Sequence, residues 1–222
     1  MRKRTPDITF VDSAMSSTFS LRRKEVVEEE PPVSQMKVRW PALFTERQIS
    51  KEFTRLVSKG LSKSFFEGLD GHLSKLIPLF RSKHYEDIPE MTSILESLDK
   101  DTTNQRMRTA ALLGLPWYMQ ENSSKFMKIC EPSDCEENVI KGVVIGILVV
   151  VENVMEPLPA SYNDVALVIE EEVVMRHMSE IPNAFLNLMG MVYALNLDYP
   201  KELKFTFEVI QHLFNAPQEF TL

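Results

Sequence analysis

The sequence predicts an α+β fold that is mainly helical, with a small sheet around residues 142–175 packed by flanking helices. The run from 143 to 151 is apolar and rich in β-branched residues, which is typical of a strand buried on both faces. Elsewhere, apolar residues recur at the spacing of amphipathic helices. The chain also holds 13 phenylalanines and 12 methionines but only 7 glycines, and this composition favours packed helices over a turn-rich β sandwich.

Residues 1–36 are expected to form a disordered N-terminal tail. The segment is rich in serine, proline and charge, and it closes with the stiff sequence Glu-Glu-Glu-Pro-Pro at 28–32. Its removal should leave the melting temperature within a few degrees of the full chain. The basic clusters at 2–4 and 22–24 are candidate nuclear import signals, although short basic runs are also common in disordered tails.

Residues 37–115 are predicted to form a helical layer, with order beginning near Trp40 and Pro41. Thr45 and Gln48 fit a capping box, so a helix should run over 45–59. Pro78 should kink or end the next helix. The three further helices of this layer are expected at 62–77, at 89–98, and from near Thr102 to a point before Gly114 and Pro116.

Residues 116–222 are predicted to form an α+β region that makes one continuous globular unit with 37–115. The segments 116–119 and 124–129 are expected to be edge strands or irregular. A buried strand is expected at 142–151, with Ile147 and Val149 fully buried, and a break at 157–159. Further strands are expected at 165–169 and 172–175, joined by a turn at Glu170 and Glu171; a strand continuing into a helix is the alternative.

Two helices should complete the chain, and a break at Tyr199 and Pro200 should set the angle between them. The first should begin near Pro182. The second should have Pro200 at its first position, because a residue before proline is pushed out of the helical region. Its predicted core residues are Leu203, Phe207, Ile210 and Phe214.

The net charge of −7 is unevenly divided along the chain. Residues 1–36 are neutral, whereas residues 37–130 hold 15 basic and 11 acidic side chains. Residues 131–222 hold 4 basic and 15 acidic side chains. Either the two oppositely charged parts attract each other within the chain, or one of them meets an external charged partner.

One candidate interaction surface is a basic ridge on the predicted helix 45–59. A spacing of four places its members on the face opposite Ile49 and Phe53. Such a ridge is either a solvated helix face or a site for phosphate or an acidic protein. The ridge has no interleaved aromatic residues or glycines that would indicate nucleic-acid recognition. The four members of the basic ridge are Arg47, Lys51, Arg55 and Lys59.

The sequence offers little chemistry for catalysis or cofactor binding. It contains no glycine-rich phosphate loop and no Gly-x-Ser-x-Gly elbow. Cys130 and Cys135 are too few for a disulfide framework and are expected to be reduced thiols of an intracellular protein. A zinc site would need two of the four histidines as ligands in addition to the two cysteines, and none of the histidines lies at the sequence spacing typical of zinc ligands. The histidines are His72, His84, His177 and His212.

Three alternative sites stay open on the sequence alone. Cys130 or Cys135 could act as a nucleophile with His177 or His212 as its base. The run 170–172 of three glutamates could bind a cation, or serve as acid and base, instead of forming an exposed turn. The third alternative is an adaptable binding groove in place of core packing for the methionines Met175, Met178, Met189 and Met191.

Three blocks of the sequence resemble one family. They are Arg-Trp-Pro-Ala-Leu-Phe at 39–44, Gly-Leu-Pro-Trp-Tyr at 114–118 followed by Phe-Met-Lys-Ile-Cys at 126–130, and a long block from Ala194 to Glu208. Together they resemble the C-terminal region of sterile alpha motif domain-containing protein 3 and its relatives, over 39–214. The sterile alpha motif domain itself is not among them, so its polymerisation is not implied. The resemblance implies no enzymatic role.

We therefore expect a non-catalytic protein-interaction or self-association module with no cofactor, inside the cell and either cytoplasmic or nuclear. No apolar run reaches the roughly 18 residues that span a membrane, and no apolar signal region follows the N-terminus. The alternative function is a nucleic-acid or chromatin adaptor that uses the basic ridge and derives from a mobile element. A second alternative, an enzyme, would need a pocket that gathers polar groups scattered in the sequence.

Overall fold

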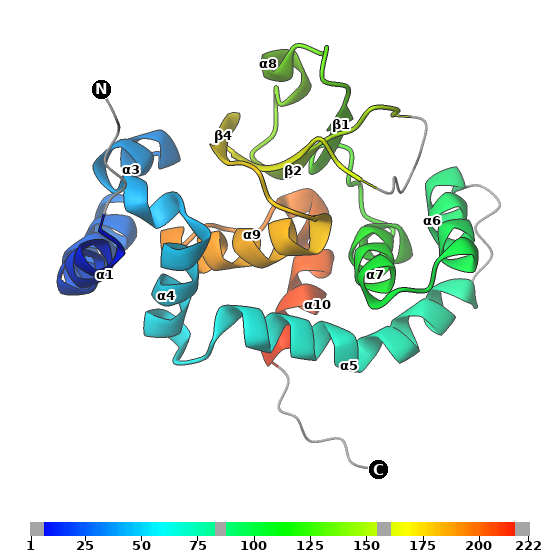
Figure 1. Ribbon diagram of the computed structural model, residues 1–222, viewed down its shortest axis with the longest axis horizontal. Coiled ribbons are helices and arrows are strands. Elements are labelled where there is room, and N and C mark those ends of the chain that lie inside the picture. Colours follow the sequence, from blue (N-terminus) through cyan, green and yellow to red (C-terminus); the bar gives the residue numbers. More distant parts are fainter. Residues whose placement is uncertain (1–6, 83–87, 155–160, 216–222) are drawn as a thin grey trace. The chain divides into compact units, whose positions relative to one another are not determined.

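The computed structural model describes residues 7–82, 88–154 and 161–215 and consists of helices and one small sheet (Figure 1). This confirms the predicted mainly helical α+β class. The chain forms two compact units, the first from residues 1–61 and 187–198, and the second from 62–186 and 199–222. This grouping differs from the predicted segments 1–36, 37–115 and 116–222. The predicted break at 157–159 and the side chain of Phe214 lie outside what the structure describes.

The described residues of the first unit form helices and the short connections between them. Asp7 caps the first helix of this unit, because its carboxylate accepts the backbone N–H of Thr9 at 2.9 Å. Its elements are α1 (Ile8–Ser17), α2 (Phe19–Lys24), the π-helical η1 (Glu25–Glu29), α3 (Val33–Arg39), the 3₁₀ turn η2 (Pro41–Phe44), α4 (Glu46–Val57) and the second half of α9 (Ile181–Leu195).

The predicted disorder of residues 1–36 is therefore wrong over the described residues 7–36. Met15, Val26, Val33 and Met36 are all buried, with at most 4% of their surface exposed. The helices α1, η1 and α3 each contribute only one or two apolar residues to the core and α2 contributes none, so no helical periodicity builds up in the sequence. Part of the charge that suggested disorder is also buried, in ion pairs that the sequence does not reveal.

Helix α4 begins as its capping box predicts, with the hydroxyl of Thr45 accepting the backbone N–H of Gln48 at 3.4 Å. The Gln48 side chain does not complete the box; it donates to Asp12 instead, at 2.7 Å. Ile49 and Phe53 are fully buried, as predicted. The helix ends at Val57, two residues before the predicted end, because Ser58 adopts a left-handed conformation with φ 60°.

Gly190 allows α9 to pack closely within the first unit. A Cβ atom at this position would overlap the side chain of Ile49 and lie 2.7 Å from that of Leu61. Nearby, the rings of Phe53 and Tyr193 meet edge to face with their centroids 5.1 Å apart. A larger residue at 190 would therefore force α9 away from α4.

The second unit opens with three helices, α5 (Leu61–Arg81), α6 (Pro89–Lys100) and α7 (Asn104–Tyr118), and in Figure 1 α6 and α7 lie next to each other near the C-terminal half of the long α5. Apolar side chains from all three meet in one cluster around Ile94, Leu98 and Ala110. Thr103 caps α7, rather than the predicted Thr102, and its hydroxyl accepts the backbone N–H of Arg106 at 3.4 Å.

Pro78 and Pro116 do not end their helices, so the predicted helix ends there are wrong, while the alternative of a kink at Pro78 stays a prediction. Helix α5 continues past Pro78 to Arg81, and α7 continues through Pro116 to Tyr118, where a strand or irregular segment was expected. Proline removes a backbone donor and clashes with the preceding turn, at a cost of about 3 kcal/mol. In α7, the residues just before Pro116 are buried almost completely, and this packing outweighs the local cost.

The sheet has four strands in the order β1-β2-β3-β4. β1 pairs with β2 in parallel, and the other neighbours are antiparallel. The strands are β1 (Met127–Cys130), β2 (Ile145–Val150), β3 (Asp164–Ile169) and β4 (Glu172–Met175). The three strands predicted within 142–175 are thus confirmed, and 124–129 contributes an edge strand.

Glu170 and Glu171 form a two-residue turn between β3 and β4, with φ angles of 53° and 59°. This is the backbone conformation of the hairpin turn whose twist matches that of its strands. The carboxylate of Glu171 accepts the backbone N–H of Gly142 at 2.9 Å. The predicted turn is confirmed, and the alternative of a strand that continues into a helix is wrong.

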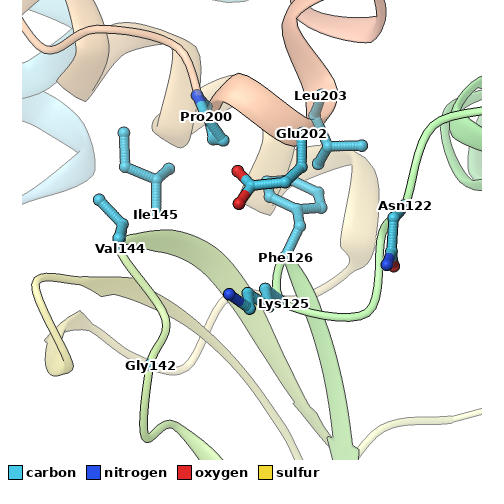
Figure 2. Close-up of a pocket in the computed structure, with 9 residues that line it drawn as sticks. All are labelled: Asn122, Lys125, Phe126, Gly142, Val144, Ile145, Pro200, Glu202 and Leu203. Carbon is cyan, nitrogen blue, oxygen red and sulfur yellow. The ribbon is translucent and has the colours of Figure 1, made fainter.

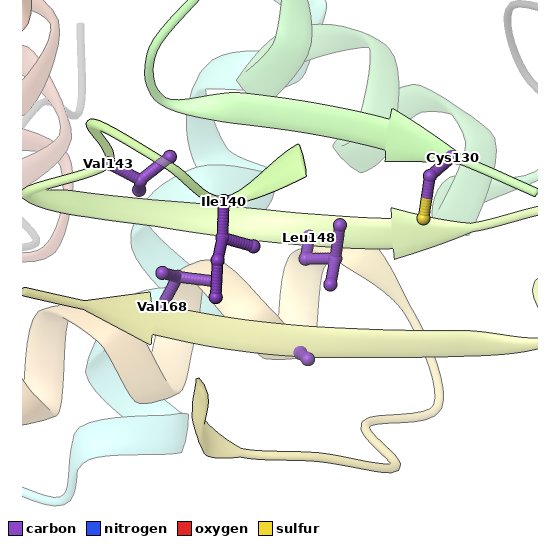
Figure 3. Packing of buried hydrophobic residues seen from close by; sticks show 6 residues of the cluster. Cys130, Ile140, Val143, Leu148 and Val168 are labelled. Carbon is purple, nitrogen blue, oxygen red and sulfur yellow. The ribbon is translucent and has the colours of Figure 1, made fainter. Parts of the chain in front are cut away.

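Both faces of the sheet are covered. On one face, Leu148, Ala166 and Val168 pack with Ile140 and Val143, next to the short helix α8 (Glu136–Val139), as Figure 3 shows. On the other face, Ile147 is 0% and Val149 is 2% exposed, which confirms their predicted burial.

The predicted break between the last two helices is also confirmed. Helix α9 ends at Leu195, where Asn196 has φ 53°. Pro200 stands one position before the 3₁₀ turn η3 (Lys201–Leu203), which leads into α10 (Lys204–Asn215). The carboxylate of Glu121 caps α10 by accepting the backbone N–H groups of Phe205 at 2.9 Å and Thr206 at 2.8 Å.

Candidate functional site

Two members of the basic ridge bind a carboxylate of their own unit. Asp12 of α1 accepts Arg47 and Lys51, each at 2.6 Å. These contacts, first with Arg47 and then with Lys51, hold the pKa of the Asp12 carboxyl well below its ordinary value of 3.8. The acidic partner of Arg47 and Lys51 is thus in the N-terminal segment, whereas the charge division suggested residues 131–222.

The third member, Arg55, joins a buried ion pair. Its guanidinium lies 2.7 Å from Glu52, which also receives two hydrogen bonds of 2.7 Å from Arg22. The side chains of Arg22 and Glu52 are only 1% and 3% exposed. Lys59 stands apart, since it is exposed and lies beyond the end of α4. The four residues therefore do not form one continuous row of free cations.

Arg39 and Trp40, at the start of the first sequence block, both bind the carboxylate of Glu25. Arg39 donates to the Glu25 carboxylate through two nitrogens, at 2.8 and 2.5 Å, and the indole of Trp40 donates at 2.8 Å. Arg39 is the main cause of a lowered pKa at Glu25. The guanidinium of Arg22 also lies 5.3 Å from the centre of the Trp40 ring. This block is thus explained by packing and not by a site.

The basic cluster at 22–24 is not an exposed, extended signal. Arg22 is buried, and Arg23 donates to the backbone oxygen of Tyr193 at 3.3 Å and to the Asn196 side chain at 3.1 Å. Only Lys24 of this cluster is largely exposed. The cluster at 2–4 lies outside the described residues.

In the second unit, Asp164 gathers polar groups that the sequence did not single out. It accepts Arg176 at 3.2 Å and the backbone N–H of His177 at 2.8 Å, and Arg176 also pairs with Glu136. His177 has φ 61° and a side chain that is 85% exposed. The group ties β3 to the end of β4 and to α8, which is a structural role.

The two cysteines are free, Cys130 buried and Cys135 exposed. Burial raises the pKa of the Cys130 thiol, which makes it a poor nucleophile. The four methionines of the proposed groove are buried, as core residues are. Within the described residues, no group of three or more His, Cys, Asp or Glu side chains has a geometry that could hold a metal ion. The helices of these same residues are all too short or too polar to cross a membrane.

An open pocket of about 60 Å³ lies in the second unit. Three segments that are distant in the sequence form it: the loop before β1, the approach to β2, and the start of η3. Its floor is apolar, from the buried side chains of Phe126, Ile145 and Leu203. The other lining residues are Asn122, Lys125, Gly142, Val144, Pro200 and Glu202.

The rim of this pocket carries one cation, one anion and an exposed apolar side chain. Val144 is 67% exposed, although its neighbour Ile145 is 4% exposed. Lys125 comes from the loop before β1 and Glu202 from η3, and both extend over the pocket in Figure 2. Neither forms an ion pair with any residue that the structure describes. Sequence reasoning missed the pocket, because no signal along the chain connects its three segments.

Comparison with known proteins gives one match. The family model described as the helical domain of sterile alpha motif domain-containing protein 3 matches residues 1–45, about a fifth of the chain. Neither a curated protein nor a solved structure matches. The matched residues include the Arg-Trp-Pro-Ala-Leu-Phe block at 39–44 and end at Thr45, the cap of α4. The described part of the matched residues is mainly helical. The resemblance over 46–214 stays a prediction. Residues 1–45 of this chain are therefore similar to the helical domain of sterile alpha motif domain-containing protein 3.

Proposed function

We propose that this chain is a non-catalytic protein-interaction module and that the pocket of the second unit is its contact surface. The observation that carries the proposal is the exposure of Val144 at the rim of an apolar floor. An aliphatic side chain in water next to buried Phe126 and Ile145 gains free energy when a partner covers it.

The size of the pocket supports a protein partner over a small molecule. Pockets that enclose small ligands measure roughly 300–1,000 Å³, whereas this one holds about 60 Å³. Such a volume suits one inserted side chain, with the rest of the contact made on the surrounding surface. A second exposed apolar side chain, that of Phe205 at 55%, follows Leu203 by two positions in the sequence.

The polar groups at the pocket favour binding over catalysis. Lys125, Glu202 and Asn122 line the rim, and none of them is joined to a nucleophile by a hydrogen bond in the described residues. The nucleic-acid alternative loses support, because Arg47 and Lys51 are already paired with Asp12, and Arg55 with Glu52. A steep loss of DNA or RNA binding with salt would restore it.

Photo-crosslinking tests the proposal. A photoreactive amino acid replaces Val144 in one protein and Val38, which is 84% exposed on α3, in the other. We expect defined adducts in cell extract, identified by mass spectrometry, from position 144 only. The substitution Val144→Glu should abolish binding of the captured protein without lowering the melting temperature, and Val38→Glu should do neither.

Equal labelling at both positions, or capture that is insensitive to Val144→Glu, contradicts the proposal. If the adduct from position 144 joins two copies of this chain, the module self-associates through the pocket. Sedimentation at several concentrations would then show a dimer that Val144→Glu dissociates.

A further inference from the structure

Resting on the proposed function, we infer that the pocket binds a segment of a partner protein in which an apolar side chain stands between an acidic and a basic residue. The apolar side chain enters the pocket. The acidic residue pairs with Lys125, and the basic residue pairs with Glu202. The recognised segment therefore has a direction, set by which charge comes first.

The floor of the pocket selects the apolar residue. Phe126 and Leu203, which are 2% and 1% exposed, close the bottom of the pocket with side chains that carry no hydrogen-bonding group. A charged or amide side chain placed there would lose its hydration without gaining a partner. Leucine, isoleucine, methionine or phenylalanine would bury apolar surface against both residues and against Val144.

The rim selects the flanking charges. Lys125 and Glu202 are both exposed and line the same pocket, but they come from segments 77 positions apart in the sequence. Some other charges of the second unit are paired: Asp70 with Arg108, Asp99 with Arg81, and Glu136 with Arg176. Lys125 and Glu202 form no ion pair with a described residue, and two such charges of opposite sign beside an apolar floor are complementary to a segment of mixed charge.

The division of roles follows from the energies of such contacts. Exposed ion pairs contribute little and weaken in salt, so the apolar residue supplies most of the affinity. Charges at the rim act mainly on orientation and on the rejection of wrong partners, because like charges repel there. A segment with its two charges exchanged would place each of them against a like charge of the protein.

A displayed peptide library tests this inference. Random twelve-residue peptides are selected on the full-length protein and on the double variant Lys125→Glu with Glu202→Lys, which keeps the net charge. The control is Lys75→Glu with Glu137→Lys, an exchange of two exposed residues away from the pocket. Peptides that still bind the protein with the substitution Val144→Glu are discarded, because their binding does not depend on Val144.

We expect the wild type and the control to select the same pattern, an apolar residue with an acid on one side and a base on the other. The double variant should select the reverse order. A synthetic peptide of the selected sequence should bind the double variant at least tenfold more weakly than the wild type, and a peptide with exchanged charges should recover that loss.

Two other results overturn the inference, and they can be told apart. Peptides that depend on Val144 but show no charge preference, or the same preference on the double variant, overturn the assignment of the partner and leave the contact surface standing. If no selected peptide depends on Val144, the proposed function fails, and the inference fails with it.

Discussion

The guanidinium of Arg22 forms two parallel hydrogen bonds of 2.7 Å with the carboxylate of Glu52, and both side chains are almost completely buried. Arg22 also donates to the backbone oxygen of Met15 at 2.9 Å and to the hydroxyl of Thr18 at 3.1 Å. One arginine thus joins α1, α2 and α4. Its remaining donors are satisfied, which is what makes a buried charge tolerable.

Breaking this pair should strongly destabilise the protein. Arg22→Met leaves the Glu52 carboxylate buried with only Arg55 beside it, and such a loss costs roughly 3–5 kcal/mol of unfolding free energy. Denaturation in urea measures the change. Lys24→Met on the same helix, at a side chain that is 63% exposed, should change the stability by less than about 0.5 kcal/mol. Similar effects of the two substitutions would mean that the pair does not stabilise the fold.

Removal of residues 1–36 should unfold the helices that pack on them. The deletion takes away Met15, Val26 and Val33 and leaves Glu52 without Arg22. We expect amide hydrogen exchange in α4 to accelerate to the rate of an open chain. Protection of α4 that survives the deletion would instead support a dispensable tail.

Gly190 and Gly71 form a matched pair of helical glycines. Gly190→Ala should destabilise by roughly 1–3 kcal/mol, since the new Cβ overlaps Ile49. Gly71→Ala meets nothing within 4 Å, so it should stabilise α5 by up to about 1 kcal/mol. Thermal unfolding of both variants would show shifts of opposite sign, and shifts of the same sign would refute the close packing at 190.

Asp12 should make stability depend on acid pH. Because Arg47 and Lys51 lower its pKa in the folded state, the unfolded chain binds the proton more tightly and the stabilisation is present at neutral pH. It is lost as the pH falls below the ordinary value of 3.8 towards the lowered pKa. Asp12→Asn should therefore be less stable than the wild type at pH 7, and the difference should shrink steadily below about pH 4. Urea unfolding across this range gives the comparison, and a difference that does not change with pH would exclude the ion pairs as its cause.

Local chemistry in the sequence was enough to predict the fold class, the buried strand, the cap at Thr45 and the break before Pro200. Each depends on neighbouring residues. Continuous β-branched residues suit a strand that is covered on both faces, and the hydroxyl of Thr45 has only to reach the backbone of its own helix.

The tertiary structure alone decided the features that depend on distant partners. A basic cluster in a polar segment predicts solvation, and only the position of Glu52 shows that Arg22 is buried. Pro116 predicts a helix end, and only the packing around α7 overrides it. The pocket joins Phe126, Ile145 and Leu203 from three separate segments. The shape of the pocket depends on the tertiary contacts that bring these segments together. Burial and ion pairing likewise depend on contacts between segments, and no single segment determines them.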